Sequence, residues 1–256
     1  MALGIIGAMD VEVELLRAHL DGVRVTCVGG MEFSEGRLGG TDAIVVRCGV
    51  GSINAAMCAQ TLAVRFGADR VVNTGVAGSL DARVGIGDVV VSTDAVNYDM
   101  DVQNLGYRPG QCPGMDTLAF AADPALREAA VAAARAVAPE AGVVEGRGAA
   151  GDKFVHEDAM RRWIGEEFGA LCCEMEGAAI AQACHVNGIP FAIVRTISAE
   201  AHGASATDYP AFERKMALRC AAIVERMAAG LASAAATAHV AVTPEGAIRE
   251  LHEVRS

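Results

Sequence analysis

Several residue types and patterns are scarce in this chain, and each scarcity narrows the range of functions. Lysine and arginine together number 21 against 32 acidic side chains, which gives a net charge of −11. A nucleic-acid binder needs a basic surface to displace counterions from phosphates, so the charge disfavours that class. No uninterrupted apolar run reaches the roughly 18 residues that a membrane-spanning helix needs. The sequence therefore predicts neither a nucleic-acid partner nor a membrane one.

Cysteine and histidine are present, but they are not grouped as a metal site or disulfide framework would require. The eight cysteines are scattered without a CxxC pair, and the six histidines have no metal-ligand spacing. The GxGxxG, GxxxxGKS/T and GxSxG patterns are also missing, so we expect no metal and no flavin or nicotinamide cofactor. The first residues lack the basic stretch of a secretory signal. We therefore expect buried free thiols in a reducing cytoplasm.

Short apolar runs typical of strands alternate with alanine-rich stretches typical of helices. This alternation predicts an α/β fold with a sheet covered on both faces. We expect one domain over residues 1–230 and a tail over 231–256, with a long loop over 99–118. Strands are expected at 3–7, 23–28, 32–38, 43–48, 70–73, 88–97, 143–149, 171–174 and 190–197, and helices at 10–20, 52–66, 123–137, 156–167, 176–187 and 210–229.

Candidate functional residues follow four predicted strands, because ligands of open α/β sheets bind beyond the carboxyl ends of strands. Glu12 follows the first strand, in the first turn of a helix, where an acid can simply complement the helix dipole or can act as a base. A glycine-rich turn is expected at 74–78. Glu174 and Glu176 close a third apolar strand, and Arg195 closes a fourth. These three form either a structural ion pair or a carboxylate that grips a sugar hydroxyl.

The joint pattern resembles the bacterial 5′-methylthioadenosine/S-adenosylhomocysteine nucleosidases of the purine nucleoside phosphorylase-like superfamily. The resemblance covers residues 3 to 229 and rests on segments in the expected order: GIIGAM at 4–9 with Glu12-Val13, NTGVAG at 73–78, GDVV at 87–90, GDKF at 151–154, EME at 174–176 and RTIS at 195–198. It implies a single domain with a central twisted mixed sheet flanked by helices. It also implies hydrolysis of an N-ribosidic bond with release of adenine.

The resemblance implies a role for each matching residue. Glu12 matches the general base that deprotonates the attacking water, and Glu176 matches the carboxylate on the ribose 2′- and 3′-hydroxyls. Met175 would lie along the sugar, and Arg195 would position Glu176. Phe154 matches the ring that stacks on adenine, and the backbone of Val155 would contact the base edge. Other positions that match the substrate pocket are Ala8, Met9, Val50, Val76, Gly78, Ser198 and Tyr209.

The resemblance also implies a homodimer, because a partner subunit closes the 5′ side of the pocket in this family. Val102, Leu105 and Pro113 match the positions that contribute to the partner's pocket. All three lie in the predicted long loop, which thereby acquires an expected role.

One position departs from the family pattern. The family has aspartate after the Arg-x-Ile-Ser segment, as the general acid that protonates purine N7, whereas this chain has Ala199. A general acid typically contributes about 10²–10⁴ in rate. The chain is then an inactivated variant, a natural enzyme in which Glu200 or Asp208 donates the proton, or a natural binder without turnover. If the lost acid limits the rate, Ala199→Asp should raise adenine release by orders of magnitude.

Three other functions stay open at the level of sequence. A nucleoside phosphorylase of the same superfamily would need cationic groups around phosphate, which Glu12 would repel. A futalosine-type nucleosidase of menaquinone biosynthesis would differ only in the 5′ substituent of its substrate. A non-catalytic nucleoside-binding protein would bind 5′-methylthioadenosine without cleaving it.

Overall fold

The computed structural model describes residues 2–199 and 209–241. Ten strands, six α-helices and one short 3₁₀ helix (η1) occur in these ranges. In chain order they are β1 (Ala2–Gly7), α1 (Asp10–Ala18), β2 (Asp21–Val28), β3 (Met31–Leu38), β4 (Thr41–Arg47), α2 (Ser52–Phe66), β5 (Ala68–Ser79), β6 (Val89–Asn97), η1 (Gln103–Leu105), β7 (Ala119–Ala121), α3 (Pro124–Val137), β8 (Val143–Ala150), α4 (Asp158–Phe168), β9 (Ala170–Glu174), α5 (Gly177–Asn187), β10 (Phe191–Ala199) and α6 (Tyr209–Ala241).

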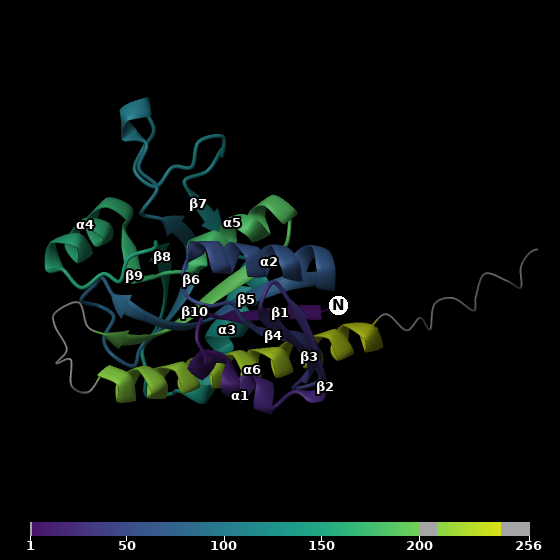
Figure 1. Ribbon diagram of the computed structural model, residues 1–256. Helices are drawn as coiled ribbons and strands as arrows, with labels where there is room; N and C mark the ends of the chain where they lie inside the picture. Colours follow the sequence, from purple (N-terminus) through teal and green to yellow (C-terminus); the bar gives the residue numbers. More distant parts are fainter. Residues whose placement is uncertain (1, 200–208, 242–256) are drawn as a thin grey trace, which may run out of the picture.

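A single mixed sheet runs through the molecule (Figure 1). Strand β1 lies between β4 and β5 and is parallel to both, while β2 and β3 extend the sheet in antiparallel pairing. Strand β10 pairs in parallel with β5 and antiparallel with β6. This arrangement confirms the predicted mixed α/β sheet. It also brings the carboxyl ends of β1, β5 and β10 to one edge.

Part of the sheet closes on itself, which the sequence analysis did not predict. Strand β6 pairs with β8, β8 with β9, and β9 returns to the far end of β5. Together with β10 these strands form a ring, so the premise of an open sheet was wrong for this half of the molecule. The closure places the end of β9 directly beside the ends of β5 and β10.

Helices cover the two faces of the sheet in separate layers. Figure 1 shows α1, α3 and α6 on one side and α2 and α5 on the other. Successive side chains of the central strands point alternately into two buried apolar clusters. One cluster is packed under α1, α3 and α6, and the other is packed under α2 and α5. Burial on both faces explains why β1 is apolar along almost its whole length.

Several local predictions needed correction. The stretch expected to be a glycine-rich turn at 74–78 is part of strand β5, because β10 and β9 supply hydrogen-bonding partners on both sides. Strand β7 was missed because it is only three residues long. Helix α6 continues through residue 230, so the expected boundary between domain and tail falls inside a helix. That division of the chain stays a prediction.

All eight cysteines are free, but not all are buried as expected. Cys27 is exposed on strand β2, and Cys112 is half-buried in the long segment between β6 and β7. Within the described ranges, no helix combines the length and apolar character needed to cross a membrane.

Candidate functional site

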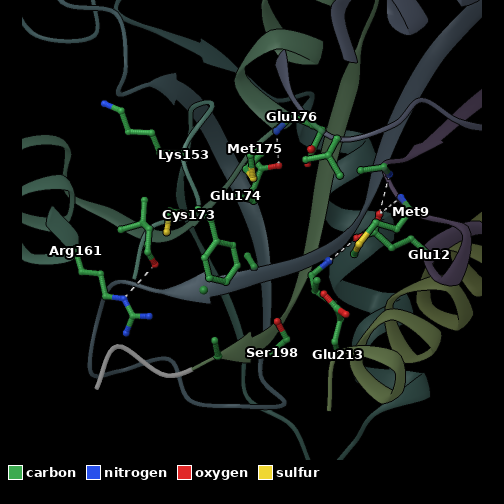
Figure 2. A pocket seen from close by; sticks show the side chains of 18 residues that line it. Met9, Glu12, Lys153, Arg161, Cys173, Glu174, Met175, Glu176, Ser198 and Glu213 are labelled. Atoms are coloured by element: carbon green, nitrogen blue, oxygen red, sulfur yellow. Dashed lines mark hydrogen bonds between the residues drawn. The ribbon is translucent and has the colours of Figure 1, made fainter. Parts of the chain in front are cut away.

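A cavity of about 200 Å³ opens at the edge where β1, β5 and β10 end (Figure 2). Its wall comes from the segments after β1, β8 and β9, from the ends of β5 and β10, and from helix α6. The lining residues are Ala8, Met9, Glu12, Val50, Val76, Ala77, Gly78, Lys153, Phe154, Val155, Arg161, Cys173, Glu174, Met175, Glu176, Ser198, Ala199 and Glu213.

Glu12 is fixed by the backbone around it. Its Oε2 accepts hydrogen bonds from the amides of Ala8 (2.7 Å) and Met9 (3.0 Å), and its Oε1 accepts one from Val76 (3.1 Å). The side chain is 2% exposed. Burial raises the pKa of Glu12 above its usual value, although Arg195 and the three amides act in the opposite direction. The carboxylate is therefore held rigidly and binds a proton more readily than an exposed glutamate.

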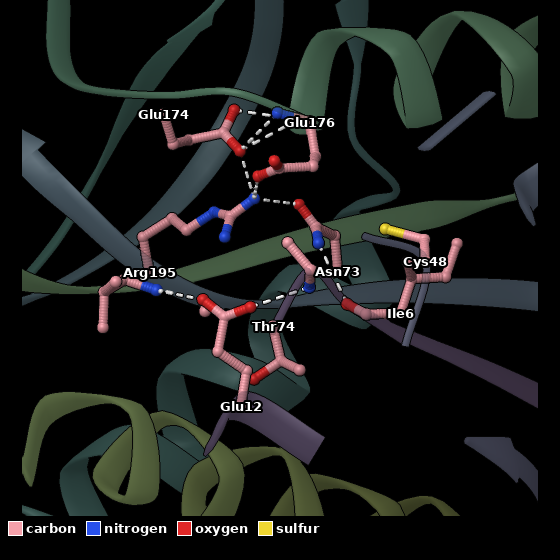
Figure 3. Close-up of polar contacts among 12 residues, drawn as sticks. Ile6, Glu12, Cys48, Asn73, Thr74, Glu174, Glu176 and Arg195 are labelled. Atoms are coloured by element: carbon pink, nitrogen blue, oxygen red, sulfur yellow. Dashed lines mark hydrogen bonds and ion pairs between the residues drawn. The ribbon is translucent and has the colours of Figure 1, made fainter. Parts of the chain in front are cut away.

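Among the residues that the structure describes, Arg195 is the one buried lysine or arginine, and it lies beneath this end of the cavity (Figure 3). Its Nη2 donates to Asn73 Oδ1 and to Glu174 Oε2, and it lies 3.7 Å from Glu176 Oε2. Asn73 is itself oriented by a 3.0 Å hydrogen bond from its Nδ2 to the carbonyl of Ile6. The guanidinium thus joins strands β1, β5 and β10 to the junction between β9 and α5.

Gly75 makes this convergence possible. A Cβ atom at this position would overlap both Arg195 Nη1 and Glu12 Oε1. Only glycine lets the backbone of β5 pass between the buried guanidinium and the buried carboxylate.

Glu174 and Glu176 have different tasks in the structure. Glu174 accepts hydrogen bonds from the amides of Glu176 (3.0 Å) and Gly177 (2.9 Å), so it fixes the start of α5 while it pairs with Arg195. Glu176 Oε1 accepts a hydrogen bond from the amide of Gly51 (2.9 Å). Burial, followed by the negative charge of Glu174, raises the pKa of Glu176 to about 7.

The opposite side of the cavity carries the positions expected to contact a base. Phe154 lines the cavity, and 66% of its surface is exposed. The carbonyl of Val155 accepts a 3.4 Å hydrogen bond from Arg161 Nε. Ser198 and Ala199 lie at the end of β10, where Ala199 pairs with Gly78. Position 199 therefore faces the cavity, but with a methyl group.

The structure brings most of the predicted site residues together, whereas a few lie elsewhere. Arg195 lies beneath the cavity rather than in its wall. Tyr209 begins helix α6, and its side chain is outside what the structure describes, as are Glu200 and Asp208. Val102, Leu105 and Pro113 do not line this cavity. Leu105 is 67% exposed on the segment that stands out from the body between β6 and β7.

Four groups that build or line the cavity were not singled out from the sequence. Asn73 and the amide of Gly51 act through contacts between distant segments, which no local pattern predicts. Arg161 and Glu213 enter the cavity from helices α4 and α6. Glu213 could have been found, since it lies four residues after Tyr209 and therefore on the same helix face. Among the described residues there is no cluster of histidine, cysteine and acidic side chains that could hold a metal ion.

Comparison with known proteins shows the family to which the chain belongs. A sequence model described as the phosphorylase superfamily matches residues 2–229, so the chain belongs to that superfamily. A 5′-methylthioadenosine/S-adenosylhomocysteine nucleosidase from Geobacillus kaustophilus is 41% identical over 229 residues, which cover 89% of this chain and 96% of the relative. Within the superfamily, the chain is a member of the 5′-methylthioadenosine/S-adenosylhomocysteine nucleosidase family, as the resemblance predicted.

Two solved structures are similar along almost their whole length. The nucleosidase of this family from Neisseria meningitidis, in complex with methylthio-immucillin-A, has a TM-score of 0.85 and 36% identity, and the match covers 90% of this chain and 99% of that one. The futalosine hydrolase of Helicobacter pylori has a TM-score of 0.80 and 29% identity, and the match covers 89% of this chain and 97% of that one.

Proposed function

We propose that this protein hydrolyses the N-ribosidic bond of 5′-methylthioadenosine and S-adenosylhomocysteine and releases adenine. The observation that carries the proposal is the pair of buried glutamates, Glu12 and Glu176, that face one cavity around a single arginine. The relatives named for this reaction and the inhibitor complex of the Neisseria meningitidis protein support it.

The charge balance of the site suits the reaction. Three carboxyl groups, those of Glu12, Glu174 and Glu176, surround one guanidinium. Cleavage at C1′ passes through a sugar with oxocarbenium character, as glycoside hydrolysis does. An excess of negative charge in a buried site stabilises such a cation and needs no reorganisation during the reaction.

Each carboxylate has a separate task in the proposed mechanism. Glu12 accepts a proton from the attacking water. Burial raises its pKa toward the pH of the surrounding solution, and a general base is most effective when its pKa is near that pH. Glu176 accepts hydrogen bonds from the ribose 2′- and 3′-hydroxyls. Arg195 lowers the pKa of Glu176 against the effects of burial and of Glu174, and so favours the anionic form of Glu176.

The remaining cavity residues form the binding surface in this proposal. Phe154 stacks on the adenine ring, the backbone of Val155 contacts its edge, and Met175 lies along the sugar. Val76, Gly78 and Ser198 border the base, while Ala8, Met9, Val50 and Tyr209 border the sugar and its 5′ substituent.

The proposal is tested by measuring adenine release from 5′-methylthioadenosine with and without phosphate. We expect release at the same rate in both cases, with the free sugar as the second product. Glu12→Gln should lower kcat by about 10²–10⁴, because the amide cannot accept the proton of water. Release that requires phosphate would identify a phosphorylase. Tight binding of the nucleoside without release over hours would identify a non-catalytic binder.

Futalosine is the second candidate substrate, because the Helicobacter pylori futalosine hydrolase shares the fold along nearly all of both chains. The two substrate types differ in the 5′ substituent, so kcat/KM measured for both compounds decides between them.

We also propose a homodimer in which the segment carrying Val102, Leu105 and Pro113 closes the partner's cavity. The 67% exposed Leu105 supports this arrangement, as does the exposed apolar surface of α2 at Ile53 and Met57 beside the cavity residue Val50. The eight unpaired cysteines support a reducing compartment such as the cytoplasm.

A further inference from the structure

Glu213 brings an additional carboxyl group into the cavity. It lies in the second turn of helix α6, four residues after Tyr209, where the helix begins. Figure 2 shows its side chain pointing from this helix toward the cavity, between Ser198 on one side and Glu12 on the other. It thus approaches the cavity from the same side as the end of β10, which carries Ala199.

Glu213 differs from the other cavity glutamates in its contacts. Glu12, Glu174 and Glu176 each accept hydrogen bonds from backbone amides, and Glu174 and Glu176 also pair with Arg195. Within 2–199 and 209–241, no hydrogen bond or ion pair connects the side chain of Glu213 to another residue. Its half-buried carboxyl group therefore has no evident structural task, in contrast to Glu225 on the same helix, which pairs with His19.

The other cavity glutamates have fixed partners in the structure. Both oxygens of Glu12 accept hydrogen bonds from amides, and in the proposed mechanism this group takes a proton from water rather than giving one to the base. Glu176 is tied to Gly51 and faces Arg195. The methyl group of Ala199 has no proton to give. Adenine is a poor leaving group as an anion, so efficient hydrolysis needs an acid in this region.

We propose that Glu213 is this acid and acts in place of the aspartate that is missing at position 199. The inference rests on the proposed nucleosidase activity. The protonated carboxyl of Glu213 gives its proton to N7 of the purine as the bond between C1′ and N9 breaks, and the electron pair of that bond stays on the purine. The oxygen of water forms the new bond to C1′, and its proton passes to Glu12. The products are neutral adenine and the free 5′-thio-substituted ribose.

The test compares Glu213→Gln with the unaltered chain on two substrates. On 5′-methylthioadenosine we expect kcat to fall by about 10²–10⁴, the usual contribution of a general acid. On the 4-nitrophenyl glycoside of 5-methylthioribose we expect little change, because nitrophenolate leaves without a proton. Glu225→Gln is the matched control on the same helix and should leave both rates unchanged. Thermal melting checks that each variant is folded.

Restoring the missing carboxyl gives an independent readout. Ala199→Asp should raise adenine release strongly in the Glu213→Gln background and only slightly in the unaltered chain. A purely structural role of Glu213 would not be rescued in this way. If Glu213 has no catalytic role, Ala199→Asp should instead raise the rate by orders of magnitude in the unaltered chain.

The outcomes separate this inference from the proposed function. If the unaltered chain releases adenine and Glu213→Gln does so equally fast, the inference is wrong and the function stands. Equal losses on both substrates would also contradict a proton donor. If the unaltered chain releases no adenine at all, both the function and the inference are wrong.

Discussion

At the scale of single residues, the environment rather than the local sequence sets the charge state of the site glutamates. Glu12 and Glu176 are both nearly buried, and burial is the largest cause of the raised pKa of each. One arginine offsets the repulsion of three carboxyl groups only in part. The site therefore holds negative charge at a cost in stability, which is the usual sign of a functional arrangement.

Glu176→Gln should make the protein more stable at pH 8. The pKa of Glu176 is raised to about 7, so the folded state binds the proton more tightly than the unfolded state does. The resulting stabilisation is complete below the unfolded pKa of about 4.3 and is lost as the pH rises through about 7. Glutamine has no ionisation to lose, and its side-chain oxygen can still accept from Gly51.

The gain at pH 8 should be on the order of 1–3 kcal/mol and should shrink toward pH 5. Chemical denaturation at several pH values measures it, and Glu166→Gln on the exposed face of α4 is the control. A gain that does not depend on pH would contradict the raised pKa.

Single residues at strand ends were easier to select from the sequence than the contacts between distant segments. Glu12, Glu176 and Arg195 were selected because an acid or a cation at the end of an apolar strand is conspicuous, and the structure places them close together. The pairing of Arg195 with the glutamates at the end of β9 was expected from the sequence, but its contact with Asn73 was not. Asn73 reaches the guanidinium from strand β5, and only the folded sheet brings β5 beside β10.

At the scale of elements, strand β5 shows where pattern reasoning failed. Its glycines favoured a turn at 74–78, but pairing with β10 and β9 keeps the chain extended to Ser79. Glycine serves at position 75 because the side chains of Arg195 on β10 and Glu12 on α1 lie close against the strand. Tertiary contacts thus overrode the local preference, as is common for strands.

Gly75→Ala should destabilise the protein by about 1–3 kcal/mol or more and abolish most activity. The new Cβ would overlap Arg195 Nη1 and Glu12 Oε1, and neither group has free space in which to move. Gly78→Ala is the matched control for stability, since a Cβ there would meet Cys173 Sγ at an ordinary 3.7 Å. Thermal melting and adenine release are the measurements. Equal stability of the two variants would show that β5 is less confined at Gly75 than the structure indicates.

At the scale of the whole molecule, the ring of strands explains why the site is assembled from the entire chain. The closure through β8 and β9 brings residues near 174 to the edge formed by residues near 12, 76 and 198. Alternation of strands and helices was enough to predict the fold class and most elements. The closure was not predictable, because it depends on pairings between strands far apart in sequence.

The segment between β6 and β7 also belongs to the scale of the whole molecule, and it does not line the cavity around Glu12 in its own chain. It stands out from the body, and Leu105 on it is 67% exposed (Figure 1). In the proposed homodimer, Leu105→Glu should weaken association and raise KM for 5′-methylthioadenosine, while the groups around Glu12 stay intact. Val25→Glu, at an exposed position on strand β2, is the control and should change neither property.

Sedimentation at micromolar concentration measures the association directly. We expect the unaltered chain to sediment at twice its mass of 26.3 kDa, and the Leu105→Glu variant to shift toward the single chain as it is diluted. Because the segment would close the cavity of the partner, KM and the dimer fraction should change together across a dilution series. A chain that stays monomeric at micromolar concentration yet keeps a low KM would refute the shared cavity, since one subunit would then bind the 5′ substituent alone.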